Sequence, residues 1–286
     1  MMASPRLQQL NGKLDLQFQY RRGKTRMTEC LQEPPLKASR VLYTDHPQRA
    51  TVYLVETSGG MVGGDEHSIS VTVDPNAQVE LIPQAATKVY PVRIPLQKTK
   101  QVIKMEIKDY GSLLWKPETL IPFINTRFQQ RVTVSLTASS TFFYGDILAP
   151  GRTHHDERFL YQMLDNRFEL FLDGQLIAFD RIKLEPLESD ISKMGMLDDY
   201  AYLGSAWFSP PPSIDFEQMK QKLHPPNENT TRFALTELEG GIFHARCLSH
   251  SNQEIKQVML DLYEVFLSLT QQKRVVFENN ALSNHS

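Results

Sequence analysis

The most unusual segment of the chain ends in two carboxylates and an imidazole, Asp65, Glu66 and His67. Four glycines lie just before or beside them: Gly59, Gly60, Gly63 and Gly64. Glycine lets a backbone turn tightly or lets another group approach it closely. A Walker phosphate loop would end in Gly-Lys-Ser/Thr, whereas an aspartate and a glutamate follow the last glycine here. The segment is therefore either a structural turn or a loop that contacts a divalent metal ion transiently.

A second group of metal-binding side chains comprises His154, His155, Asp156 and Glu157. Imidazole suits nickel, zinc and copper, and carboxylates can complete such a shell. Neighbouring side chains on a strand point to opposite faces, so only a loop would let all four reach one ion. A solvated polar loop is the alternative interpretation, and the commoner outcome for such a segment.

His244, Cys247 and His250 have a spacing that resembles part of a metal site. Residues 241–248 read as a strand, so His244 and Cys247 should face opposite sides. A zinc site also needs two paired half-sites, and the chain has only one incomplete one. We expect a buried structural cysteine and surface histidines here. The chain has no Gly-x-Ser-x-Gly nucleophile elbow either, which favours a binding or scaffold role over catalysis.

Composition excludes several classes of protein. The net charge of −2 and the pI near 6.5 argue against a nucleic-acid binder, which usually has a basic face. Residues 1–10 lack the apolar core of a secretory signal, and no apolar run reaches the roughly 18 residues that span a membrane. Cys30 and Cys247 are far apart in sequence and are expected to be free thiols in a reducing compartment. These features predict a cytoplasmic protein.

The elements that must position these residues are mainly strands. Apolar and polar residues alternate in Leu14–Tyr20, Ile69–Val73 and Val132–Leu136, as they do in strands with one buried face. Asp173-Gly174, between two further strand patterns, predicts a hairpin. We expect a single mainly β domain over residues 1–286, built as a sandwich, barrel or stack of many short strands.

About two helices complete the expected fold. One covers Asn252–Leu269, and its apolar stripe should pack on the β core. The stripe comprises Ile255, Val258, Met259, Leu262, Phe266 and Leu269. A shorter helix is predicted at Ile214–Leu223, after a run of prolines. The polar tail 279–286 is expected to be disordered.

Five segments, taken in order along the chain, resemble the urease accessory protein D/H family (UreD/UreH). They begin at Gly12–Leu16 and continue with the Gly-Gly-x-x-x-Gly-Asp pattern that ends at Asp65. The segment Gln84-Ala85-Ala86-Thr87-Lys88-Val89-Tyr90 and the segment Leu113–Phe123 follow. The last segment is Gly151-Arg152 with Glu157 five residues later. The resemblance is specific because the five motifs keep their order.

The resemblance implies a fold, a role and partners. Family members form a β-helix-like stack of strands, bind apo-urease and recruit a UreF-type accessory protein and a UreG-type GTPase. The assembly delivers nickel to urease, and the D/H protein itself catalyses nothing and has no permanent cofactor. On this basis Asp65, Glu66, His67 and Glu157 are expected along a nickel path. Structural or partner roles are expected for Gly59, Gly60, Gly63, Gly64, Gln84, Thr87, Lys88, Tyr90, Gly151 and Arg152. A carbohydrate-active β-sandwich enzyme and a lectin-like binding module are the alternatives from other classes.

Overall fold

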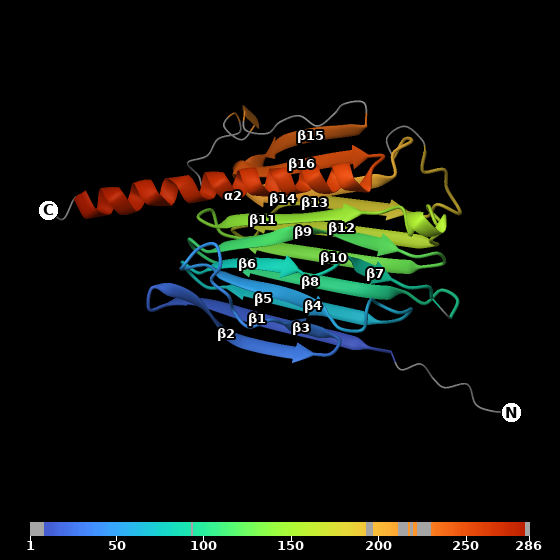
Figure 1. Cartoon of the computed structure of the whole chain (residues 1–286), viewed down its shortest axis with the longest axis horizontal. Helices are drawn as coiled ribbons and strands as arrows, with labels where there is room; N and C mark the ends of the chain where they lie inside the picture. The colour runs from blue at the N-terminus through green and yellow to red at the C-terminus, as the bar shows by residue number, and fades with distance from the viewer. Residues whose placement is uncertain are drawn as a thin grey trace.

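The computed structural model describes residues 9–92, 94–192, 197–210, 217, 220, 221 and 230–283, with side chains of the last helix described to residue 270. Sixteen strands in this part of the chain form two sheets that pack face to face (Figure 1). The mainly β fold expected from the sequence is therefore confirmed. No helix among the described residues is long and apolar enough to cross a membrane.

The first sheet, sheet A, has seven strands in the order β13-β12-β10-β8-β5-β1-β2. Strands β12, β10, β8, β5 and β1 run parallel to one another. The strands are β1 (Asn11–Arg21), β2 (Lys24–Glu33), β5 (Glu66–Val73), β8 (Thr99–Ile107), β10 (Arg127–Leu136), β12 (Met163–Leu172) and β13 (Gln175–Leu184).

The second sheet, sheet B, has nine strands. Eight follow the order β15-β16-β14-β11-β9-β6-β4-β3, and β7 pairs with β9. The strands are β3 (Leu36–Ala38), β4 (Ala50–Glu56), β6 (Gln78–Pro83), β7 (Thr87–Val89), β9 (Ser112–Pro122), β11 (Thr141–Leu148), β14 (Tyr202–Ser209), β15 (Thr231–Leu238) and β16 (Ile242–Ser249). The 3₁₀ turns are η1 (Thr153–His155) and η2 (Glu239–Gly241).

From β4 to β12 the chain alternates between the sheets, apart from the short β7, which follows β6 in sheet B, so that successive turns extend both sheets. The parallel ladders within each sheet result from this winding, which is the β-helix-like stack that the family resemblance implies. The predicted hairpin joins β12 to β13. Its turn residues Asp173 and Gly174 have positive φ angles of 48° and 81°, as a two-residue hairpin turn requires.

Helix α2 (Asn252–Ser283) covers the outer face of sheet B, and its C-terminal part extends past the strands (Figure 1). The predicted apolar stripe packs against Phe143, Phe208 and Phe243, because the buried side chains of the stripe recur at helical spacing. The helix continues beyond the predicted Leu269 and includes residues 279–283 of the tail, whose disorder stays a prediction. The predicted helix Ile214–Leu223 lies outside the described residues, apart from 217, 220 and 221.

A buried polar cluster also fixes α2 on sheet B. Tyr263 Oη donates to Glu80 Oε1 at 2.6 Å, and Arg49 Nε lies 3.5 Å from Glu80 Oε2. The Glu80 and Arg49 side chains are almost completely buried. Buried charges are tolerated only when paired, so this cluster specifies where the helix docks.

Candidate functional site

A row of polar side chains crosses the inner face of sheet A. His67, Gln101, Gln130 and Asn166 are directly opposite one another on β5, β8, β10 and β12. Residues opposite each other in a ladder point to the same face. The next inner positions along these strands are core residues: Ile69, Ile103, Val132 and Phe168. The polar row therefore occupies positions that the strand pattern would assign to the core.

A second polar row crosses the inner face of sheet B. Glu118, Asp146, Ser205 and Arg246 are opposite one another on β9, β11, β14 and β16. A shift in register brings the first two together, since Trp115 pairs with Tyr144 but Glu118 pairs with Asp146. The extra residue in β9 is a β-bulge, which returns Glu118 to the inner face. We call these two facing rows the polar belt.

Part of the polar belt lines a cavity of about 170 Å³ between the sheets. His67, Gln101, Gln130, Glu118 and Asp146 all line it. A smaller cavity of about 30 Å³ adjoins it, and the two share Gln130, Tyr144 and Asp146 in their walls. One water molecule occupies roughly 30 Å³ of liquid, so the larger cavity has room for several waters or a hydrated ion.

Three belt side chains present polar atoms without a hydrogen-bond partner among the described residues: His67 Nε2, Asn166 Oδ1 and Arg246 Nε. Gln130 Nε2 donates to Gln101 Oε1 at 2.9 Å, which orients the amides between them. Buried polar groups are normally hydrogen-bonded. The three unpartnered atoms therefore point to a belt that works in contact with solvent or a ligand.

The electrostatics of the belt suit a cation that is held weakly. Burial and, to a smaller extent, nearby Asp180 raise the pKa of Asp146 to about 7, although Arg246 opposes the shift. Burial lowers the pKa of His67, with Glu56 and Asp65 opposing. His67 is therefore neutral at pH 7, and a neutral imidazole nitrogen can accept a metal ion. Among the described residues, no three His, Cys, Asp or Glu side chains are grouped so that they could hold a metal ion together.

Several residues of the predicted motifs line the mouth of the larger cavity. They are Gly59, Gly60, Gln84, Thr87 and Lys88. Met61 N donates to Lys88 O at 2.9 Å and Tyr90 N donates to Met61 O at 2.8 Å. The segment Gly59–Gly64, which we call the glycine loop, therefore pairs with residues 87–90. A Cβ on Gly60, whose φ is 138°, would lie 2.7 Å from Lys88 O. Only glycine allows this close packing of the two motifs.

Asp65 and Glu66 lie outside the cavity walls. Asp65 is buried, and its carboxylate oxygens accept hydrogen bonds from Leu10 N at 2.9 Å and Val62 N at 2.8 Å. This arrangement braces the glycine loop, in which Gly64 packs against Gln97. Glu66 is exposed and pairs with Lys100 at 2.6 Å. No contact distinguishes Gly63. A nickel contact by Asp65 or Glu66 stays a prediction, and the geometry gives Asp65 a structural task.

Glu157 forms an ion pair with Arg152 and accepts a hydrogen bond from Ile124 N at 3.3 Å. Arg152 in turn lies over the Phe123 ring, 4.3 Å from its centroid, and Tyr90 packs edge-on against the same ring. The Arg152 hydrogen bond lowers the pKa of Glu157. Gly151, with a φ of 138°, approaches Glu157 O too closely for a side chain. These motif residues thus stabilise a corner next to the cavity mouth, and a nickel role for Glu157 stays a prediction.

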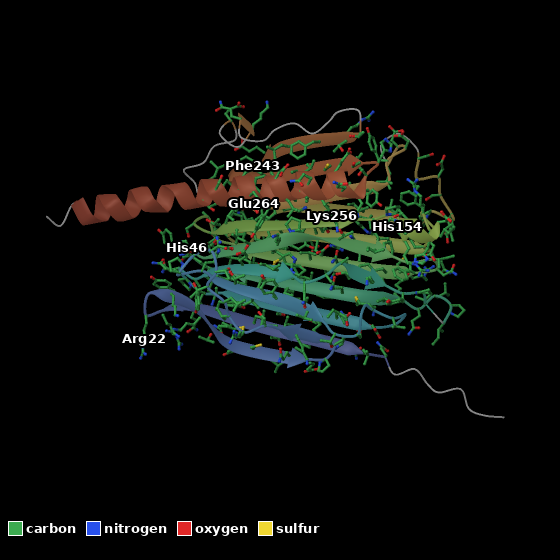
Figure 2. The ribbon with its side chains drawn as sticks, viewed as in Figure 1. Arg22, His46, His154, Phe243, Lys256 and Glu264 are labelled. Atoms are coloured by element: carbon green, nitrogen blue, oxygen red, sulfur yellow. The ribbon has the colours of Figure 1, made fainter. Side chains whose placement is uncertain are left out.

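The other predicted metal-binding groups do not converge. His154 and His155 are exposed on η1, at the end of the sandwich (Figure 2). Cys247 is buried beneath α2, and burial raises the pKa of its thiol to about 12. His244 faces the inter-sheet layer and stacks on Trp207, so the predicted opposite orientation of His244 and Cys247 is confirmed. The expectation of a surface position for His244 is wrong, because its ring is part of an aromatic stack.

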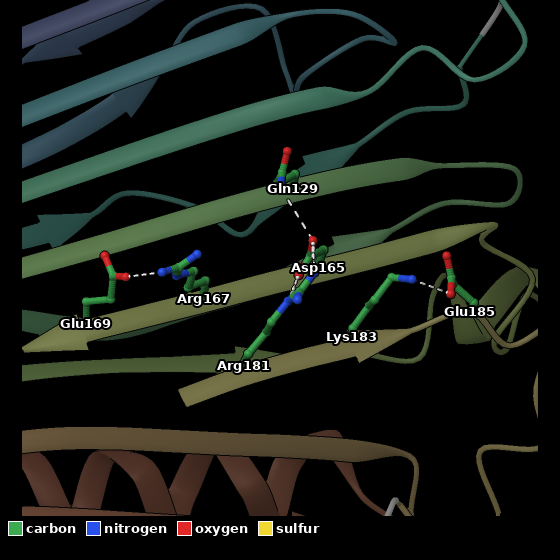
Figure 3. Close-up of polar contacts among 7 residues, drawn as sticks. All are labelled: Gln129, Asp165, Arg167, Glu169, Arg181, Lys183 and Glu185. Atoms are coloured by element: carbon green, nitrogen blue, oxygen red, sulfur yellow. Dashed lines mark hydrogen bonds and ion pairs between the residues drawn. The ribbon is translucent and has the colours of Figure 1, made fainter. Parts of the chain in front are cut away.

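The outer face of sheet A differs from the inner one. It carries ion pairs between Arg181 and Asp165, Arg167 and Glu169, and Lys183 and Glu185 (Figure 3). The cations of these pairs are partly exposed, although Asp165 itself is buried, so solvent screens the pairs and each contributes little to stability, about 0–1 kcal/mol. This face therefore offers matched control positions on the same strands as the polar belt.

Reasoning from sequence missed every member of the polar belt except His67, namely Gln101, Glu118, Gln130, Asp146, Asn166, Ser205 and Arg246. A signal was present, because Gln101 and Gln130 stand in phase with the apolar residues of their strands. Asp146 is likewise the single charge in the otherwise uncharged strand β11. Only strand register could show that these exceptions share one cavity.

The chain is similar to known proteins over most of its length. The model of the UreD urease accessory protein family matches residues 10–277. The chain belongs to the UreD urease accessory protein family. UreD of Halalkalibacterium halodurans is 44% identical over 266 residues, covering 93% of this chain and 97% of that protein. UreD proteins of Sporosarcina pasteurii and Lysinibacillus sphaericus are 36% and 35% identical, covering 88% and 90% of this chain and 98% and 96% of their own lengths. The family resemblance seen in the sequence is thus confirmed.

Proposed function

We propose that this chain is a non-catalytic maturation factor of the cytoplasm that carries nickel ions toward apo-urease through its inter-sheet cavity. It would act together with a UreF-type accessory protein and a UreG-type GTPase, bound to the urease subunits. The observation that carries the proposal is the polar belt. Within an otherwise apolar sandwich, it places His67, Glu118 and Asp146 around one cavity whose mouth is built from family motifs.

The chemistry of the belt fits transit rather than storage. Nickel binds nitrogen and sulfur ligands more tightly than oxygen ligands. The belt offers mostly oxygen atoms, from Glu118, Asp146 and the amides of Gln101 and Gln130, and a single imidazole. An ion that meets such groups one or two at a time is held weakly and can move on, so no resident cofactor is required.

The test is an activation assay on co-expressed components. The tagged chain is purified with apo-urease and the two partners, and urease activity is measured after nickel, bicarbonate and GTP are added. The double variant Glu118→Gln/Asp146→Asn should still co-purify but should lower the nickel content of urease several-fold. Glu106→Gln, on the exposed face of β8, is the matched control and should leave nickel content unchanged.

Two results would contradict the proposal. One is full nickel loading by the double variant, which would remove the cavity from the route. The other is activation that proceeds equally well without this chain. In that case the carboxylates of the cavity would have to be tested for another activity, such as turnover of a carbohydrate by the purified chain.

A further inference from the structure

The smaller cavity adjoins the larger one at Asp146 and ends at an ion pair that connects the two sheets. Asp180, on β13 of sheet A, lines the smaller cavity. Arg246, on β16 of sheet B, donates from Nη2 to Asp180 Oδ2. Arg246 is also the last member of the sheet B row, opposite Ser205, which is opposite Asp146. The pair therefore stands at one end of the polar belt.

The other groups around this end are either neutral or already paired. Arg167 lines the smaller cavity, but its guanidinium pairs with Glu169 and lies over the Phe179 ring. His244 is half-buried and stacks on Trp207, and burial together with nearby Arg246 lowers its pKa to about 4, so it carries no charge near pH 7. Tyr144 is also buried and uncharged, because burial raises its pKa. The local charge is thus set by Asp146, Asp180 and Arg246.

We propose that Arg246 sets how tightly the passage retains a divalent cation, because it neutralises Asp180 and so limits the negative charge that the cation meets in the smaller cavity. The inference rests on the proposed nickel route and adds to it a residue that sets how strongly the ion is retained. With the pair intact, only Asp146 offers an uncompensated carboxylate. Without Arg246 two carboxylates would face the ion, and without Asp180 a free guanidinium would repel it.

Charge variants of the pair test this inference, with nickel retention measured by equilibrium dialysis of the full chain against Ni²⁺ alone. Arg246→Gln should retain nickel several-fold more tightly than the wild type. Asp180→Asn should retain it several-fold less tightly. The double variant Asp180→Asn/Arg246→Gln restores the local net charge and should return close to the wild type, and Arg246→Lys should do the same.

The opposite signs separate charge control from a merely structural role. If the pair only joined the sheets, both single variants would lose the same contact and would change nickel retention in the same direction. That result would overturn the inference. Arg181→Gln and Asp165→Asn remove an ion pair of the same type from the outer face of the same hairpin (Figure 3), and should leave retention unchanged. Thermal unfolding of each variant identifies any loss of fold. If Arg246→Gln does not fold, Asp180→Asn keeps the test open, because unchanged or tighter nickel retention by that variant would overturn the inference.

Failure of this inference can be told apart from failure of the proposed function. If Glu118→Gln/Asp146→Asn lowers urease activation while both single variants of the pair behave as the wild type, the passage stands and the role of Arg246 is wrong. If the Glu118/Asp146 variant and the pair variants all load urease normally, the nickel route itself is wrong.

Discussion

At the scale of single residues, burial decides what the carboxylates of this chain can do. Asp65 accepts two backbone hydrogen bonds and Glu157 binds Arg152, so both have their oxygens occupied by the fold. Asp146 lies between the sheets, where no described side chain donates a hydrogen bond to it and the nearest opposing charge is already paired with Asp180. Of the three, Asp146 is the carboxylate that is free to meet a passing cation.

The raised pKa of Asp146 predicts a pH-dependent cost to stability. The folded state keeps its proton up to about pH 7, whereas the unfolded chain loses it near the ordinary value of 3.8. Between these values the folded state binds more protons, so the free energy of unfolding falls as pH rises toward 7. Asp146→Asn cannot lose this proton. We expect the variant to gain about 2 kcal/mol relative to the wild type between pH 5 and pH 8.

Urea unfolding of both proteins at pH 5, 6, 7 and 8 checks this prediction. Groups that titrate elsewhere in the chain are common to both proteins and cancel in the difference. A stability difference that stays constant over this range would show that Asp146 is ionised throughout, and that burial does not perturb it.

At the scale of elements, the cavity mouth depends on close backbone packing between the glycine loop and the strand β7. Gly59 and Gly60 both have positive φ angles, 83° and 138°. A Cβ on Gly59 would meet no atom within 4 Å, whereas a Cβ on Gly60 would meet Lys88 O and the Tyr90 ring at 2.7 Å. A side chain would thus strain the backbone at both positions, but only at Gly60 would it also collide with neighbouring atoms.

Gly59→Ala and Gly60→Ala should therefore differ in effect. Gly59→Ala should lower the free energy of unfolding by about 1–2 kcal/mol, because alanine disfavours the left-handed backbone conformation at this position. Gly60→Ala must also separate the loop from β7 and should cost about 2 kcal/mol more, as overpacking of a well-packed site does. Chemical unfolding of both variants measures the difference. Equal losses would mean that the loop can move away from β7 freely, and that Gly60 has no packing role.

At the scale of the whole molecule, the fold combines an apolar sandwich with a polar interior. On one side of the belt lies the main core of the sandwich, and on the other lies a separate apolar cluster around Phe128, Leu148 and Leu164. Nothing in the stability of a sandwich requires a polar layer between two apolar ones. A fold that carries such a layer gives up packing at that place, which is typical of a functional site.

Replacing the amide pair by apolar residues should separate stability from function. Gln101→Leu/Gln130→Leu removes both partners of one hydrogen bond and leaves neither unsatisfied, so stability should stay within about 1 kcal/mol of the wild type or rise. The same change makes the cavity apolar, and nickel loading of co-expressed urease should fall several-fold. Thermal unfolding and the nickel content of urease measure the two effects. If the double variant lost stability but loaded nickel normally, the amide pair would serve the fold and not the nickel route.

The sequence by itself determined the local features of this protein. Period-two alternation specifies strands such as β1, β5 and β10, because one face of each is buried. Asp173-Gly174 specifies its hairpin, since both residues tolerate positive φ, and the apolar stripe specifies the buried face of α2. The order of the glycine, Gln84–Tyr90 and Gly151–Glu157 motifs also identified the family.

Only the tertiary structure decided which side chains share a site. His67, Gln101, Gln130 and Asn166 are separated by dozens of residues and meet because four parallel strands align in one register. A bulge in β9 brings Glu118 opposite Asp146, and no local sequence pattern predicts this bulge. Conversely, Asp65 and Glu66 are neighbours of His67 in sequence, but they leave the cavity because adjacent side chains diverge. Sequence proximity groups Asp65 and Glu66 with His67, whereas strand register brings Glu118 and Asp146 to the cavity that His67 lines.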